Sequence, residues 1–136
     1  IEESYSCNAD AVLLIVGLLK ERTGILLNKC NERGLEALVE VHNEAELRIA
    51  LEIGTRLIGI NNRNLETMKV DLETTGRLIE LIPKNKIIIS ESGVQNKTDA
   101  EYLASLSVNA ILVGTTLMKS PDLGKAVKDL SGIKFV

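Results

Sequence analysis

Short apolar runs alternate with helical segments along the whole chain, and this alternation most limits the fold. Each run has the length of a strand and is apolar almost throughout, which is typical of strands covered on both faces in a parallel sheet. Such strands are joined by right-handed crossovers. We therefore expect an α/β protein built from parallel (β/α) units. The five predicted strands are residues 9–16, 36–41, 57–61, 87–92 and 110–114.

The segments between these strands carry helix start and stop signals. Gly34 is suited to closing a helix, Asn43 and Glu46 form a capping box, and Thr98 and Glu101 form a second one. Residues 1–6 have the pattern of the end of a further helix. The five predicted helices are residues 21–33, 43–53, 71–81, 98–106 and 122–130.

Two architectures accommodate five such units. One is a doubly wound open sheet of the flavodoxin type, and the other is part of an eight-stranded (β/α)8 barrel, which takes about 250 residues. With 136 residues, of which 45% are hydrophobic and 26% charged, the chain suits one globular domain. The strand count alone does not choose between the two.

Polar side chains in phase with one another end three of the strands. Because strand side chains alternate in direction, Glu40, Asn61 and Glu91 point to the same rim. Two carboxylates facing an apolar interior have environments that can move their pKa values apart, which suits proton transfer in both directions. We therefore take these three residues as candidates for catalysis.

His42 is the only histidine. It has no partner at metal-ligand spacing, so we expect a hydrogen-bonding residue at the rim, and no metal site is predicted. We expect the two cysteines, Cys7 and Cys30, to be small buried apolar residues.

The last two strands end in glycines and hydroxyls, at Ser92, Gly93, Gly114 and Thr115. Such ends place backbone N–H groups near helix starts, where they can hold phosphate, and the loops after the seventh and eighth strands of barrels often do so. We therefore predict a phosphate site there.

Charge and composition argue against several classes of partner. The net charge is −3 with scattered basic residues, and aromatic residues make up 2% of the chain, so a nucleic-acid surface is not expected. With no long apolar run and two cysteines, we expect a cytoplasmic protein without membrane contact.

The motifs together resemble one family, indole-3-glycerol phosphate synthase, a (β/α)8-barrel enzyme of tryptophan biosynthesis. The resemblance covers nearly the whole chain, in the family's order and spacing. It rests on the segments ADAVLLI (residues 9–15), GLEALVEVH (34–42), IGINNRNL (58–65), SESGV (90–94) and NAILVGTTLM (109–118).

The resemblance implies a carbon–carbon lyase that converts 1-(2-carboxyphenylamino)-1-deoxyribulose 5-phosphate to indole-3-glycerol phosphate, without a metal or organic cofactor. It implies catalytic roles for Glu40, Asn61 and Glu91, and contact between Leu13 and the anthranilate ring. The residues that would surround the phosphate are Arg63, Ser92, Gly93, Gly114 and Thr115.

By the same likeness, residues 1–136 correspond to strands four to eight, a single incomplete (β/α)8-barrel domain. The family's lysine general acid would lie upstream, so we expect little activity from this chain alone, and self-association or pairing with an N-terminal barrel piece through open strand edges. The family usually has glycine where this chain has Asn8 and Ser107, and aspartate at Asn64; these are turn positions.

The sequence also fits other interpretations. The chain could belong to another phosphate-binding barrel enzyme, to a non-catalytic five-stranded α/β binding module, or to a subunit that assembles only with a partner. Glu40, Asn61 and Arg63 favour the synthase among the barrels. Leu14 and Ile15 stand where a phosphoacceptor module would have acidic residues.

Overall fold

Five parallel strands form one sheet in the computed structural model, which describes all residues from 1 to 136. They lie in sequential order, β1-β2-β3-β4-β5, without the reversal of order that marks a doubly wound sheet. The strand order therefore confirms a partial barrel and excludes the flavodoxin alternative. The strands are β1 (Ala11–Ile15), β2 (Glu36–Val41), β3 (Leu57–Asn61), β4 (Ile87–Glu91) and β5 (Ala110–Leu112).

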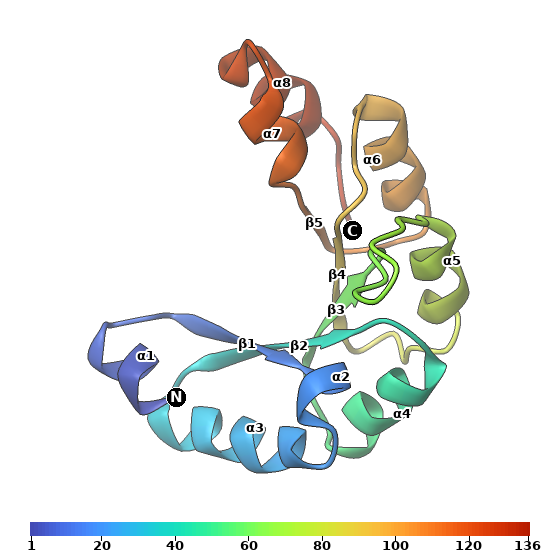
Figure 1. The fold of residues 1–136 in the computed structure, drawn as a ribbon. Coiled ribbons are helices and arrows are strands. Elements are labelled where there is room, and N and C mark those ends of the chain that lie inside the picture. Colours follow the sequence, from blue (N-terminus) through green and yellow to red (C-terminus); the bar gives the residue numbers. More distant parts are fainter.

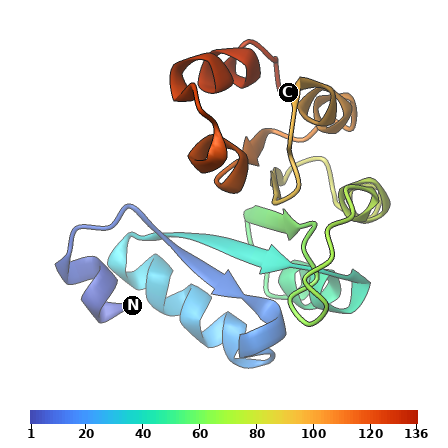
Figure 2. The same cartoon turned by 45° about the horizontal axis from the view of Figure 1, so that its top comes forward.

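Helices cover the convex side of the curved sheet, and the concave side is open (Figures 1 and 2). The predicted helices all form, with ends shifted by a few residues. Two short helices that follow β1 and β5, α2 (Val16–Leu19) and α7 (Thr115–Lys119), were not predicted. The helices are α1 (Glu2–Ser6), α2 (Val16–Leu19), α3 (Arg22–Arg33), α4 (Glu44–Glu52), α5 (Glu73–Ile79), α6 (Lys97–Ser105), α7 (Thr115–Lys119) and α8 (Leu123–Ser131).

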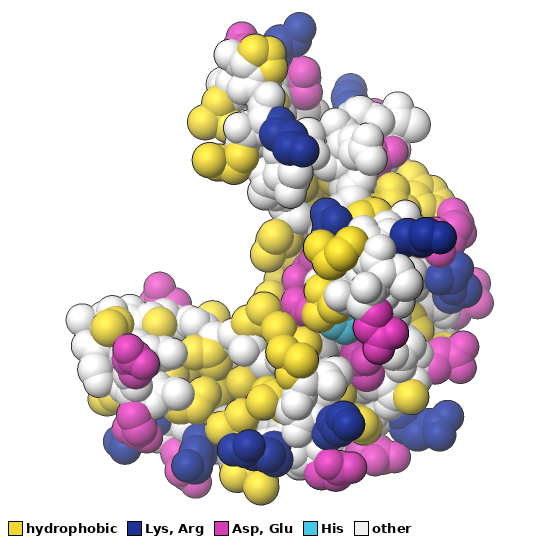
Figure 3. All heavy atoms as spheres, in the orientation of Figure 1, with side chains coloured by type: hydrophobic (Ala, Val, Ile, Leu, Met, Phe, Trp, Pro, Cys, Tyr) yellow, Lys and Arg dark blue, Asp and Glu magenta, His cyan; other side chains and the backbone are white.

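The hydrophobic core lies between the sheet and the helices. Val39, Ile58 and Ile60 of the central strands are fully buried on this side. On the concave side, Leu13 and Leu112 are 48% and 49% exposed, and apolar side chains border the hollow in Figure 3. One face of the sheet is therefore packed as in a complete barrel, while the other is an uncovered apolar surface.

The outermost strands are β1 and β5. β1 pairs only with β2, and β5 pairs only with β4, so one edge of each strand has unpaired backbone groups. The prediction of two open edges is confirmed. β5 is also shorter than predicted, because it ends at Leu112 and not at Gly114.

Helix ends follow the local sequence, with one correction. α3 closes at Gly34 in the left-handed conformation, with φ of 69°, as predicted. The predicted capping box at Thr98 is wrong: Asn96 begins α6, and its side-chain oxygen accepts from Asp99 N. Asparagine is among the strongest N-caps and outranks threonine, and Asp99 reciprocates by accepting from Gln95 N.

Asn8 and Ser107, the two positions where the family usually has glycine, both have positive φ angles, 56° and 65°. Both residues lie in turns just before a strand, as predicted. Of the two cysteines predicted to be buried, Cys30 is buried, but the prediction is wrong for Cys7, which is exposed. Every helix falls short of the length and apolar character that crossing a membrane requires.

Candidate active site

The strand register brings the three candidate catalytic residues to one rim. Glu40 lies opposite Gly59, and Asn61 lies opposite Glu91 on the neighbouring strand. All three side chains are buried, with exposed fractions of 3% for Glu40, 8% for Asn61 and 5% for Glu91. The predicted phase of the strands is therefore confirmed, while the catalytic roles of these residues stay a prediction.

Asn61 connects Glu40 to the loop that follows β3. Its Nδ2 donates to Glu40 Oε1 over 3.1 Å, and its Oδ1 accepts from the backbone N–H of Arg63 over 3.0 Å. These two bonds fix which way the amide points. Asn61 therefore offers its donor to the Glu40 carboxylate and holds the start of the loop that carries Arg63.

Glu91 lies against Gly59 and close to Glu40. A Cβ atom on Gly59 would overlap Glu91 Oε1, so glycine is what leaves room for the carboxyl group in its present position. Burial, followed by the negative charge of Glu40 and a hydrogen bond with it, raises the pKa of Glu91 to about 7. Glu91 Oε1 is buried without a hydrogen-bond partner, which is costly for a carboxylate and favours the protonated form. Glu91 can therefore hold a proton near neutral pH.

His42 lies between two carboxylates. Its Nδ1 is 3.0 Å from Glu46 Oε2, and the same oxygen accepts from the His42 backbone N–H. Its Nε2 is 3.1 Å from Glu40 Oε1, but the direction of approach is not that of a hydrogen bond, so we treat this as an electrostatic contact. Figure 3 shows the histidine bordered by acidic side chains. His42 thus lies at the rim beside Glu40 and is held there by Glu46.

All five residues expected around a phosphate line a single pocket of about 840 Å³. Gly93 has a φ of 97°, and a Cβ there would overlap Val70 and Leu72, so the turn requires glycine. The pocket lies at the carboxyl ends of β4 and β5, next to the Glu40–Glu91 pair. The five residues are Arg63, Ser92, Gly93, Gly114 and Thr115.

Two further cations line this pocket, Lys97 at the start of α6 and Lys119 at the end of α7. With Arg63 they face only one acidic lining residue, Asp129, so the pocket favours an anion. Neither lysine was predicted from the sequence as a site residue. A basic residue at a helix start, four residues after the rim glycine Gly93, was the available signal for Lys97.

Leu13 lies elsewhere in the hollow. It is on β1, paired in register with Leu38, and it faces the open concave surface outside the phosphate pocket. No group of three or more His, Cys, Asp or Glu side chains is arranged to hold a metal ion.

Comparisons with known proteins agree with this geometry. The family model for indole-3-glycerol phosphate synthase matches residues 1–130. The synthase of Caldanaerobacter subterraneus subsp. tengcongensis is 51% identical over 119 residues, which are 88% of this chain and 46% of that protein. The synthase of Polynucleobacter asymbioticus is 47% identical over 131 residues, 96% of this chain and 49% of that protein.

A solved structure, the thiamine phosphate pyrophosphorylase from Pyrococcus furiosus, has a similar fold. It superposes with a TM-score of 0.74 at 22% identity, over 96% of this chain and 62% of that one. The chain spans about half the length of the curated relatives that it matches. From the family model and these identities, the chain belongs to the indole-3-glycerol phosphate synthase family.

Proposed function

We propose that this chain supplies the carboxyl-terminal strands of an indole-3-glycerol phosphate synthase acting on 1-(2-carboxyphenylamino)-1-deoxyribulose 5-phosphate. The observation that carries the proposal is the position of Glu40, Asn61 and Glu91 at one rim, beside a pocket lined by cations and rim glycines. A substrate with a phosphate at one end and an aromatic ring at the other would span these two parts.

The reaction joins an aromatic ring carbon to the ketose carbon, after which the ring carboxylate leaves as carbon dioxide and the hydroxyl as water. The ketose oxygen takes up one proton as the new bond forms, and the later loss of water uses one proton and releases one, so the reaction consumes one proton in total. Loss of carbon dioxide restores the aromaticity of the ring without releasing a proton. As water departs, the Glu40 carboxylate would accept a proton from the methylene carbon beside the nitrogen, and a protonated Glu91 would donate to the departing hydroxyl. The raised pKa of Glu91 supports this division of roles.

The remaining contacts are assigned to binding. Leu13, half-exposed on the concave face, would pack against the anthranilate ring, and Asn61 would orient the substrate through the donor it now gives to Glu40. Arg63 and the backbone around Gly93 and Gly114 would hold the phosphate. We expect the reaction to take place in the cytoplasm.

We also propose that the chain has little turnover by itself. The family resemblance implies a lysine general acid that has no counterpart at the strand ends here, and a positioned acid is typically worth about 10²- to 10⁴-fold in rate. The open edges of β1 and β5 and the exposed apolar face support pairing with a polypeptide that carries the preceding strands, or self-association.

The test mixes this chain with the amino-terminal half of a related synthase and measures indole-3-glycerol phosphate formation by chromatography. We expect turnover from the mixture and little from either part. Glu40→Gln should reduce the turnover of the mixture at least about 100-fold, while Glu36→Gln, on the same strand but exposed, should leave it unchanged. Equal activity of the two variants would refute the role of Glu40, and rapid turnover by the chain alone would refute its dependence on a partner.

A further inference from the structure

A buried polar cluster lies behind the candidate site, on the helix side of the sheet. It consists of Asn62 just after β3, Thr75 in α5 and Ser90 in β4, with exposed fractions of 2%, 0% and 0%. None of the three lines the phosphate pocket, and none has a part in the proposed chemistry. Such groups are costly to bury unless they are fully paired, so their contacts need an explanation.

The side-chain nitrogen of Asn62 holds the end of β4. Nδ2 donates to Ser90 Oγ over 3.0 Å, to the carbonyl of Glu91 over 3.0 Å and to the carbonyl of Ser92 over 3.1 Å. The backbone N–H of Asn62 donates to the Glu91 carbonyl as well, over 2.9 Å. One asparagine thus fixes three consecutive residues at the strand end, where the chain turns toward Gly93.

The side-chain oxygen of Asn62 holds the start of α5. Oδ1 accepts from Thr75 N over 3.1 Å and from Thr75 Oγ1 over 2.8 Å, and Thr75 Oγ1 is also 2.8 Å from Ser90 Oγ. These bonds close the β3–α5 loop at its base. That loop carries Arg63 into the pocket and brings Val70 against Gly93.

We propose that Asn62 is a positioning residue of the phosphate pocket. Its amide nitrogen sets the Ser92–Gly93 turn, its amide oxygen sets the loop that bears Arg63, and the two are thereby held in one fixed relation. An apolar side chain at this position would fill the same space but would hold neither the Glu91 carbonyl nor the Ser92 carbonyl. Phosphate as the ligand rests on the proposed function, whereas the clamping of the two loops rests on the contacts alone.

Two substitutions separate the halves of the clamp. Asn62→Asp keeps the oxygen that faces Thr75 but removes the donor to β4, and Thr75→Val removes a hydroxyl at nearly constant size. Thr75→Val is the milder change and keeps the test decisive if Asn62→Asp does not fold. Thr23→Val in α3 is the matched control, because Thr23 is also 0% exposed and donates one side-chain hydrogen bond, to Lys20 O over 2.6 Å.

The readouts are the backbone amide order parameters of Ser92 and Gly93 and the affinity for inorganic phosphate, both measured by NMR on the 136-residue chain. We expect Asn62→Asp and Thr75→Val to lower the order parameters of these two amides more than those in the rest of the sheet. Phosphate affinity should fall roughly five- to tenfold. Thr23→Val should lower the melting temperature by a similar amount and change neither readout.

The outcomes are distinguishable. Unchanged order parameters at Ser92 and Gly93 in both variants overturn the positioning role, whatever happens to phosphate affinity. An equal effect of Thr23→Val on these amides also overturns it. Lower order parameters in a chain that binds no phosphate support the clamp and count against the proposed function instead.

Discussion

Replacing Glu91 by glutamine should remove a loss of folding stability that the wild-type chain undergoes as the pH rises. In the folded chain the pKa of Glu91 is about 7, against an ordinary 4.5, because the carboxyl group is buried beside Glu40. A difference of about 2.5 pH units corresponds to about 3 kcal/mol of unfolding free energy, at 1.36 kcal/mol for each unit. This is a large part of the stability of a typical domain.

The direction follows from which state holds the proton. Between pH 4.5 and 7 the unfolded chain has released the Glu91 proton, whereas the folded chain retains it, so the unfolding free energy falls as the pH rises. The contribution of Glu91 to the unfolding free energy is fully present below about pH 4.5 and is lost as the pH rises through 7. Glutamine cannot ionise, and its amide can still donate to Glu40. The stability of Glu91→Gln relative to wild type should therefore rise from near zero at pH 4.5 to about 3 kcal/mol above pH 8.

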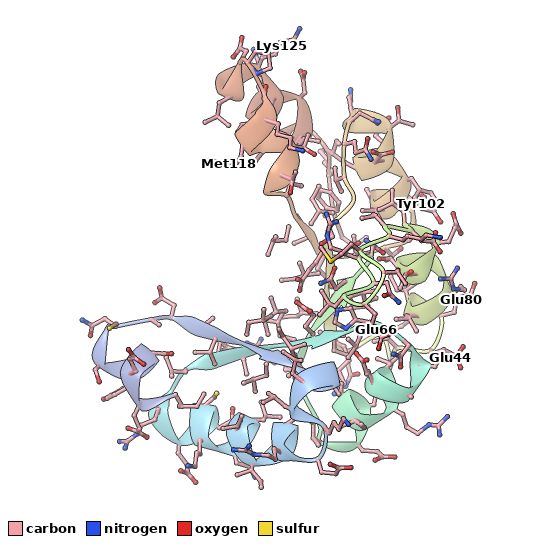
Figure 4. All side chains as sticks on the ribbon, in the orientation of Figure 1. Glu44, Glu66, Glu80, Tyr102, Met118 and Lys125 are labelled. Carbon is pink, nitrogen blue, oxygen red and sulfur yellow. The ribbon has the colours of Figure 1, made fainter.

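Urea unfolding followed by far-ultraviolet circular dichroism measures this difference, since the chain has no tryptophan to serve as a fluorescent probe. Glu80→Gln is the control, because Glu80 is exposed just after α5 and points away from the sheet (Figure 4). The control should run parallel to wild type at every pH. A difference between Glu91→Gln and wild type that does not change with pH, or that shrinks as the pH rises, would refute the reasoning.

Two further predictions concern glycine at particular backbone positions. Gly59→Ala should destabilise the fold by about 1–3 kcal/mol in urea unfolding, because the new methyl group would overlap Glu91, and the cost should shrink in a Glu91→Ala background. An unchanged cost in that background would contradict the assigned overlap. Ser107→Gly should stabilise the chain by about 1 kcal/mol, since its φ is 65°, while Asn8→Gly should gain less because asparagine tolerates this conformation. A larger gain at Asn8 would contradict this account.

The elements and their order could be predicted from the sequence because each depends on nearby residues. The apolar run of β2 and the left-handed closure at Gly34 are local features, and both formed as predicted. The start of α6 was missed because Asn96 and Thr98 both resemble caps, and the stronger cap begins the helix. The short helix α2 was missed because Val16 continues an apolar run that also reads as strand.

The candidate site was predictable where strand phase determines it, and not where two loops meet. Alternation alone put Glu40 and Glu91 on one rim, since a parallel register preserves the side of each residue. The partners of Asn62 lie 13 to 30 residues away in sequence, and nothing in their spacing marks them as a cluster. His42 was expected only as a rim residue, because its contact with Glu40 depends on side-chain direction.

The sequential strand order also bears on how the chain reaches this structure. Each strand pairs only with a strand that directly precedes or follows it in sequence, so no pairing waits for a distant segment. Closing the connection between consecutive strands costs less entropy than closing a longer one would. A nucleus formed around Val39 and Ile58, paired neighbours in the core of β2 and β3, can be extended one (β/α) unit at a time in both directions, as in repeat proteins.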